Sequence, residues 1–350
     1  MTKPKFKILS IDGGGIRGII PCKILSYIET QIGGNLSDTF DLIAGTSTGG
    51  IITLGLTTKK PDDDCPYYAE EMLELYRKNG KLIFAKRQKD FLSRIGSVFK
   101  KTKAITENPY DSSNLEKLLS DYFRGAMLKN SKTNVLVTTY DISEGKPFIF
   151  STRLAKVFDS ENIKEDFLVE EIARSTSAAP TYFEPSIIRD KAGGDFAFVD
   201  GGVFANNPSI LAYCEGKELY KIQTKAFDAK VTQSDSDLPF YLLSIGTGIS
   251  RQRISGQDAK KWRAANWLNP LLSSVFMQSV AESTHYTLQH LLPPYENGTP
   301  RYQRINVTIP EENSQMDNVS DENINKLCEF AENYIKENES TLLQVCEMLK

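Results

Sequence analysis

Histidine is nearly absent from this sequence: only His285 and His290 occur in 350 residues. Both lie in the run S-T-H-Y-T-L-Q-H-L-L, which reads as a helix and has no glycine turn or strand end to present a side chain. They are five residues apart and do not closely share one helix face. Because chain order alone cannot exclude it, a Ser-His-Asp triad stays open, but packing or surface roles are favoured.

Cysteine and long apolar runs are also scarce. The five cysteines are scattered and never occur in C-x-x-C spacing, which argues against a disulfide framework and a zinc site and predicts reduced, packed thiols. Residues 264–281 carry no charge but include asparagine, proline, serine and glutamine, so a membrane span is not expected there. Core packing is the first interpretation of this stretch, and lipid contact or a lid is the second. No metal or cofactor is predicted.

The overall composition, 40% hydrophobic and 25% charged, is that of an ordinary soluble globular protein. A formal net charge of −3 gives no general case for binding a nucleic-acid polymer. The N-terminus runs straight into a strand without an apolar signal core, and Thr2 stands where myristoylation would require glycine. We therefore expect a cytoplasmic protein.

Positive charge is concentrated in residues 77–103, where ten Lys or Arg stand against a single acid, Asp90. Apolar side chains interleave with these charges, a mixture suited to lying on an anionic bilayer surface. The first interpretation is peripheral membrane contact through this stretch. The second is a solvated connector whose apolar residues pack on the domain.

The stretch F-D-L-I-A-G-T-S-T-G-G, residues 40–50, contains G-x-S-x-G between an apolar run of strand type and a buried helix. This is the context of a nucleophile elbow, in which a serine on a sharp strand-to-helix turn exposes its hydroxyl. The flanking Gly45 and Gly49 let the strand and helix backbones approach closely. The helix N-terminus suits the oxyanion that forms when a serine attacks a carbonyl, so Ser47 is the candidate nucleophile.

A glycine loop, D-G-G-G-I-R-G at residues 12–18, follows the first predicted strand and precedes a predicted helix over 19–32. Its G-x-G-x-x-G spacing fits a dinucleotide site, but Asp12 is a poor neighbour for pyrophosphate, and the serine turn replaces the acid expected after the second strand. A second interpretation is an oxyanion hole with Arg17 nearby. Its donors would be the N–H groups of Gly13, Gly14 and Gly15. A turn that only permits tight packing is the third.

Asp200 ends a predicted strand, 196–199, within F-A-F-V-D-G-G-V-F-A-N-N-P. A carboxylate there, beside two glycines, is placed to accept a proton from a neighbouring serine. An aspartate with an ordinary pKa of ~4 is a feeble base, so such a site must rely on oxyanion stabilisation and on desolvation. A turn-forming Asp-Gly-Gly without a catalytic role is the alternative.

Four motifs, D-G-G-G-I-R-G, G-T-S-T-G, A-A-P-T-Y-F-E-P and D-G-G-V-F-A-N-N-P, occur in that order and together resemble the patatin-like phospholipase family over residues 5–248. The resemblance implies a three-layer α/β/α fold and a calcium-independent lipid acyl hydrolase that acts on phospholipid or lysophospholipid without a cofactor. It also implies a catalytic dyad of Ser47 and Asp200. The family's oxyanion loop matches Gly13, Gly14, Gly15 and Arg17.

The order strand, glycine loop, helix, strand, glycine turn, helix by itself indicates a mainly parallel sheet covered by helices. We expect a catalytic domain over residues 1–310 with the basic insertion 77–103, and a C-terminal helical extension over 311–350 packed on it. The alternative functions are a non-enzymatic acyl-binding or storage protein on the same fold and a dinucleotide-binding protein. The resemblance also reaches bacterial antiviral phospholipase effectors, in which a cyclic nucleotide activates membrane damage, although no motif identifies a regulatory site for such an activator.

Overall fold

The computed structural model describes residues 4–86, 109–160, 166–189, 194–224, 239–250, 255–263 and 277–350. The strands are β1 (Phe6–Ile11), β2 (Leu42–Thr46), β3 (Asn134–Asp141), β4 (Lys146–Ser151), β5 (Ser186–Arg189), β6 (Asp195–Asp200), β7 (Phe240–Ile245) and β8 (Tyr302–Ile305). The longer helices are α1 (Ile19–Ile32), α3 (Thr48–Thr57), α4 (Ala69–Ile83), α5 (Ser112–Phe123), α6 (Thr152–Ser160), α7 (Val169–Thr176), α9 (Ser209–Thr224), α12 (Met277–Leu291), α13 (Asp321–Glu337) and α14 (Glu339–Leu349). Short helical turns are η1 (Gly15–Gly18), α2 (Leu36–Thr39), η5 (Leu128–Asn130), α8 (Gly202–Ala205), α10 (Gly256–Ala259) and η8 (Glu311–Asn313).

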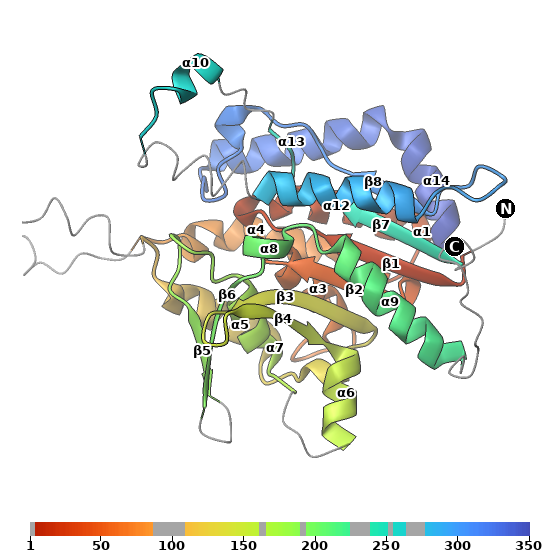
Figure 1. Ribbon diagram of the computed structural model, residues 1–350, viewed down its shortest axis with the longest axis horizontal. Coiled ribbons are helices and arrows are strands. Elements are labelled where there is room, and N and C mark those ends of the chain that lie inside the picture. Colours follow the sequence, from red (N-terminus) through yellow and green to blue (C-terminus); the bar gives the residue numbers. More distant parts are fainter. Residues whose placement is uncertain are drawn as a thin grey trace, which may run out of the picture.

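One sheet forms the middle of the molecule (Figure 1). Strands β3, β2, β1, β7 and β8 lie side by side and run parallel, whereas β4, β6 and β5 join at the β3 end by antiparallel pairing. The predicted α/β fold with a mainly parallel sheet is therefore confirmed. The carboxyl ends of the parallel strands share one edge of the sheet, where α/β proteins place their sites.

The register of β3 brings the ends of β2 and β6 together. Strand β2 pairs with β3 as far as Thr46 opposite Thr138, and β6 pairs with the next residues, ending with Asp200 opposite Thr139. Strand β4 pairs with β3 over both of these stretches and so occupies its other edge. The last residue of β6 therefore adjoins the end of β2.

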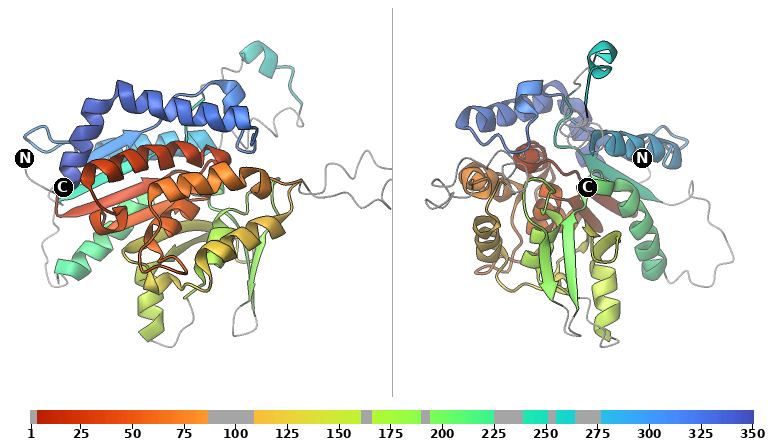
Figure 2. Two further views of the ribbon diagram at one scale, coloured as in Figure 1. Left: turned by 180° about the vertical axis from the view of Figure 1, so that it is seen from behind. Right: turned by 60° about the vertical axis from the view of Figure 1, so that its left-hand side comes forward.

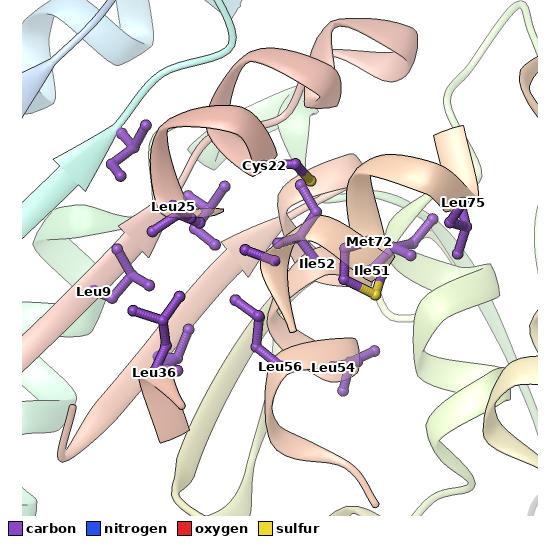
Figure 3. Packing of buried hydrophobic residues seen from close by; sticks show 14 of the residues in the cluster. Leu9, Cys22, Leu25, Leu36, Ile51, Ile52, Leu54, Leu56, Met72 and Leu75 are labelled. Atoms are coloured by element: carbon purple, nitrogen blue, oxygen red, sulfur yellow. The ribbon is translucent and has the colours of Figure 1, made fainter. Parts of the chain in front are cut away.

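Helices cover both faces of the sheet (Figure 2). Alternate strand residues point to opposite faces, as β1 shows: Leu9 lies in one buried cluster and Ile8 in another. The larger cluster packs the sheet against α1, α3, α4 and α13, and Figure 3 shows its centre. The smaller packs the other face against α9 and α12. This arrangement gives the three layers that the resemblance implied.

The C-terminal helices α13 and α14 pack on α1. Leu327 and Ala331 of α13 are fully buried in the same cluster as the residues of α1. The predicted helix over 19–32 coincides with α1, and Gly33 ends it in the left-handed conformation with φ of 75°. Within the described residues, no helix combines the length and the apolar character needed to cross a bilayer.

Candidate active site

Ser47 lies on a sharp turn between β2 and α3. Its backbone has φ of 55° and ψ of −124°, a conformation that side-chain-bearing residues rarely adopt and that often marks a functional position. The glycines on either side permit it: a Cβ on Gly45 would lie 2.1 Å from the carbonyl oxygen of Gly49, and a Cβ on Gly49 would lie 2.2 Å from that of Ile11. The turn thus has the geometry of a nucleophile elbow.

Hydrogen bonds with threonine hydroxyls hold this turn in place. The N–H of Ser47 donates to Thr176 Oγ1 at 2.8 Å, and that hydroxyl donates in turn to the carbonyl of Thr138 at 2.7 Å. The hydroxyls of Thr46 and Thr138 are 2.7 Å apart, and Thr46 Oγ1 also donates to the carbonyl of Ala205 at 2.7 Å. Helix α7 and the segment after β6 are therefore tied to the serine turn through hydrogen bonds, which sequence patterns did not reveal.

Asp200 meets Ser47 at the end of β6, as the register of β3 requires. Its carboxylate accepts a hydrogen bond from the N–H of Gly202 at 2.7 Å, and the Ser47 side chain lies close enough to favour the ionised form. Asp200 is only 3% exposed. Burial raises its pKa to about 6 from an ordinary value of 3.8, and the Ser47 side chain and the N–H of Gly202 oppose the rise. A carboxylate with this pKa is still ionised at neutral pH and is a stronger base than an exposed aspartate.

Neither histidine reaches this pair. His285 Nδ1 lies 3.0 Å from the hydroxyl of Tyr302, and His290 Nδ1 lies 2.8 Å from the carbonyl of Tyr286 in its own helix. Burial lowers the pKa of His285, with Arg304 adding to the effect. The histidines take packing and surface positions on α12, so the Ser-His-Asp alternative has no geometric basis in this structure.

The glycine loop after β1 passes next to the serine. A Cβ on Gly13 would lie 3.2 Å from Ser47 Cβ. The N–H of Gly13 donates to the carbonyl of Asn206 at 3.0 Å, and the carbonyl of Gly13 accepts from Thr247 Oγ1 at 2.7 Å. Gly13 is therefore held by both of its backbone groups, and its predicted use as an oxyanion donor does not fit this bonding. Among the described residues, the N–H groups of Gly14 and Gly15 have no acceptor, so they remain available.

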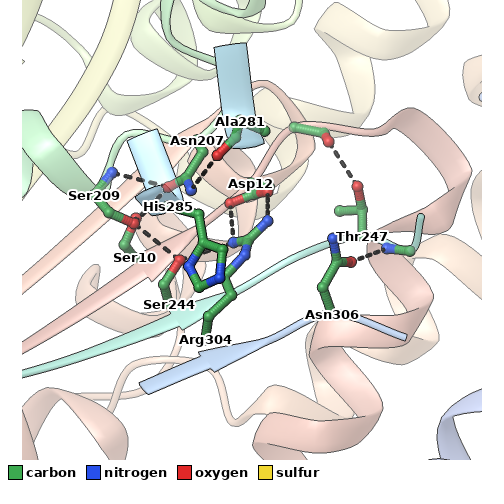
Figure 4. Close-up of polar contacts among 12 residues, drawn as sticks. Ser10, Asp12, Asn207, Ser209, Ser244, Thr247, Ala281, His285, Arg304 and Asn306 are labelled. Carbon is green, nitrogen blue, oxygen red and sulfur yellow. Dashed lines mark hydrogen bonds and ion pairs between the residues drawn. The ribbon is translucent and has the colours of Figure 1, made fainter. Parts of the chain in front are cut away.

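A buried ion pair anchors the start of this loop (Figure 4). Arg304 of β8 reaches both carboxylate oxygens of Asp12 at 2.8 and 2.5 Å and also donates to Ser244 Oγ at 2.8 Å. The two side chains are 7% and 4% exposed. Burial raises the pKa of Asp12, which Arg304 opposes. A bidentate pair of this kind fixes orientation as well as charge, and no motif around Arg304 predicted its role.

Arg17 lies on η1, one turn beyond the loop. Its Nε donates to the carbonyl of Gly14 at 3.3 Å. Burial lowers its pKa to about 10, so the guanidinium is charged at neutral pH. Its terminal nitrogens have no hydrogen-bond partner in the part of the chain that the structure describes. Arg17 is thus a cation beside the loop, attached to it by one bond.

An apolar cavity of about 280 Å³ opens at Ser47 and Asp200. Its walls come from α3, α4, α5 and the segment A-A-P-T-Y-F-E-P. That segment supplies Ala179, Pro180, Thr181, Tyr182 and Phe183. Thr181 has φ of 73°, which is rare for a β-branched residue. A cavity of this character beside a nucleophile suits a hydrocarbon chain with a reactive carbonyl at one end.

The comparison with known proteins agrees with this geometry. The patatin-like phospholipase family model matches residues 9–213, more than half of the chain. The chain belongs to this family. Patatin-like protein 2 of Oryza sativa subsp. indica is 34% identical to it, over 75% of this chain and 65% of the relative, so the alignment spans just under two thirds of that protein. Patatin-like protein 1 of Arabidopsis thaliana is 31% identical, over 93% and 80% of the two chains. Probable inactive patatin-3-Kuras 1 of Solanum tuberosum is 32% identical, over 79% and 71%.

Part of this patatin-like site comes from beyond the matched residues. Arg304 lies there, and so does Met316, whose carbonyl accepts the N–H of Ile16 at 2.9 Å. A Cβ on Gly15 would lie 2.3 Å from that same carbonyl oxygen. At Gly15 and Ile16 the chain itself therefore occupies the position where a dinucleotide's pyrophosphate would approach the backbone.

Most of the basic insertion of this patatin-like chain, residues 87–103, lies outside the described residues, as do residues 264–276. In the described part, Arg77 and Lys78 pair with Glu74 at 2.6 and 3.3 Å, and Lys81 pairs with Asp321 at 2.7 Å. Arg77 and Lys78 share the single carboxylate of Glu74, so the three cations are compensated only in part within the fold. Any electrostatic attraction to a membrane would therefore depend mainly on the later cations of the stretch.

Proposed function

We propose that this chain is a calcium-independent lipid acyl hydrolase, a phospholipase A or lysophospholipase, that forms an acyl-serine at Ser47. The observation that carries the proposal is the position of the Ser47 side chain beside the buried carboxylate of Asp200, at one end of an apolar cavity. A nucleophile, a base in contact with it and a place for an acyl chain are the minimum that ester cleavage requires.

In the proposed reaction, Asp200 takes the hydroxyl proton as Ser47 Oγ attacks the ester carbonyl. The N–H groups of Gly14 and Gly15 and the N-terminus of α3 are the candidate donors to the oxyanion. When the carbonyl re-forms, the ester C–O bond breaks and Asp200 returns the proton to the departing alcohol. Water then repeats the sequence on the acyl-serine and releases the fatty acid.

The test is fatty-acid release from phospholipid vesicles and from a short acyl ester. We expect Ser47→Ala and Asp200→Asn each to lower kcat by at least about a thousandfold, because each removes a group that acts in the transition state. Ser37→Ala and Asp141→Asn are matched controls, since both are buried residues outside the cavity. Full activity in either of the first two variants would refute the dyad. Added chelator should not change the rate.

The second candidate is an acyl-binding or storage protein without turnover. The name of the potato relative, which calls that protein probably inactive, is the observation that keeps it under consideration. A serine-reactive fluorophosphonate decides between the two. Stoichiometric labelling that Asp200→Asn abolishes supports an enzyme, whereas lipid binding without labelling or release supports storage.

We also propose peripheral, cytoplasmic action at membranes through the cations of residues 77–103. Neutralising Lys86, Arg87 and Lys89 together should reduce flotation with anionic vesicles, by roughly 1 kcal/mol of binding free energy per charge. Activation by a cyclic nucleotide, as in the bacterial effectors, would appear as fatty-acid release only when the nucleotide is added. Constitutive activity on vesicles would exclude such control.

A further inference from the structure

A second cavity, of about 530 Å³, lies against the apolar one. The two share the wall residues Thr181, Tyr182, Met277 and Met316. The second is lined mainly by polar side chains, which include Asp12 and Asn206 on either side of the glycine loop. An ester held at Ser47 would therefore have an apolar cavity for its acyl chain and a polar cavity next to it.

The charges of the polar cavity are unequal. Arg304 and Asp12 neutralise each other in their ion pair. Among the described residues, the lining also holds the cation Arg17 and the acids Glu282 and Asp317. Arg17 has terminal nitrogens without a partner in the described part of the chain, so it can bind an anionic oxygen. Asp317, which accepts a hydrogen bond from Tyr110 at 2.5 Å, and Glu282 lie in the same lining.

We propose that the polar cavity binds a zwitterionic lipid headgroup, a phosphodiester that carries an ammonium group, with the phosphate beside Arg17 and the ammonium towards Glu282 and Asp317. Phosphoethanolamine and phosphocholine have this chemistry. An anionic headgroup such as phosphoglycerol gains the contact with Arg17 but brings no ammonium to Glu282 and Asp317, which repel its negative charge. The inference rests on the proposed hydrolase function and specifies its substrate class.

The test compares kcat/KM for phosphatidylethanolamine, phosphatidylcholine and phosphatidylglycerol with identical acyl chains. Each lipid is diluted in neutral detergent micelles so that surface charge does not affect docking. We expect the wild type to favour both zwitterionic lipids over phosphatidylglycerol by at least about tenfold, equivalent to roughly 1.4 kcal/mol. Glu282→Gln with Asp317→Asn should bring that ratio close to one. The matched control, Glu218→Gln with Asp64→Asn, removes two acids that do not line either cavity and should leave the ratio unchanged.

A short acyl ester without a headgroup separates the two hypotheses. If the chain hydrolyses this ester but cleaves the three lipids at equal rates, or if the double variant keeps the wild-type ratio, the headgroup inference is overturned and the proposed hydrolase stands. If the chain hydrolyses neither the ester nor any lipid, the proposed function fails and takes this inference with it.

Discussion

Replacing Asp200 by asparagine should inactivate the protein and also make it more stable at neutral pH. The folded pKa of Asp200 is about 6, against 3.8 for an ordinary aspartate, because burial disfavours the ionised form. Between these two values the folded state binds more protons than the unfolded state, so stability falls as pH rises through this window. Above it, ionised Asp200 lowers the free energy of unfolding by roughly 3 kcal/mol, since each pKa unit is worth about 1.36 kcal/mol.

An asparagine avoids this penalty and keeps the main contacts. Its carbonyl oxygen can accept the hydrogen bond from the N–H of Gly202, and its amide can donate to the hydroxyl of Ser47. The gain should therefore approach about 3 kcal/mol at pH 8 and fall to about half of that at pH 5, where the wild-type carboxyl is mostly protonated in the fold. For 350 residues with ~2 cal/mol/K of unfolding entropy each, the gain at pH 8 raises Tm by about 4 °C.

Thermal or urea unfolding at pH 5 and pH 8 measures this gain, with fatty-acid release assayed on the same samples. Asp141→Asn is the control: its carboxylate accepts charge-assisted hydrogen bonds from the N–H and hydroxyl of Ser143, and a neutral amide makes these bonds more weakly, so the substitution should lower stability at both pH values. If Asp200→Asn were no more stable than the wild type at pH 8, or gained the same stability at both pH values, the inference that Asp200 is buried and ionised at neutral pH would be refuted.

Further predictions concern the base, the elbow and the ion pair. On a short soluble ester, kcat/KM should fall tenfold per pH unit below about 6, because protonated Asp200 cannot accept the serine proton; a flat profile down to pH 4.5 would contradict this. Gly49→Ala should abolish activity and lower the free energy of unfolding by about 1–3 kcal/mol or more, because its Cβ would lie 2.2 Å from a carbonyl oxygen of β1. Gly34→Ala is the control and should leave stability unchanged, because a Cβ there has nothing within 4 Å. Urea unfolding measures both variants. Arg304→Gln combined with Asp12→Asn should keep a folded protein but lower kcat about tenfold or more with little change in KM, and an unchanged kcat would show that the pair only supports the fold.

The sequence allowed Ser47 and Asp200 to be predicted because each has a local signal. A strand followed by G-x-S-x-G, or by aspartate and two glycines, predicts a tight turn from the local sequence alone. That the two turns meet depends on the register of β3, which pairs Thr138 with one strand end and Thr139 with the other. Only the resemblance to a family placed the two residues together beforehand.

Other parts of the site had no local signal. Arg304 lies on a short edge strand 292 positions from Asp12, and nothing in Y-Q-R-I distinguishes its arginine from a surface cation. The bonding of the Gly13 N–H to Asn206 depends likewise on how the segment after β6 returns to the sheet. Such contacts come from tertiary packing between distant segments, which neither composition nor periodicity encodes.

Burial has different consequences for Asp200 and Asp12 in this site. For Asp200 it raises the basicity of a carboxylate that no histidine of the described residues contacts, and the charge of its ionised form is partly offset by the Gly202 N–H and the Ser47 side chain. Burial would have the same effect on Asp12, but the guanidinium of Arg304 binds both carboxylate oxygens and neutralises the charge. Under the proposed mechanism, the carboxylate of Asp200 stays available to accept a proton and that of Asp12 is held by Arg304, and the difference lies in whether a cation reaches the carboxylate. Arg17 is attached to the glycine loop, and its terminal nitrogens have no partner among the described residues, so within that part of the chain it is a cation that a substrate can use.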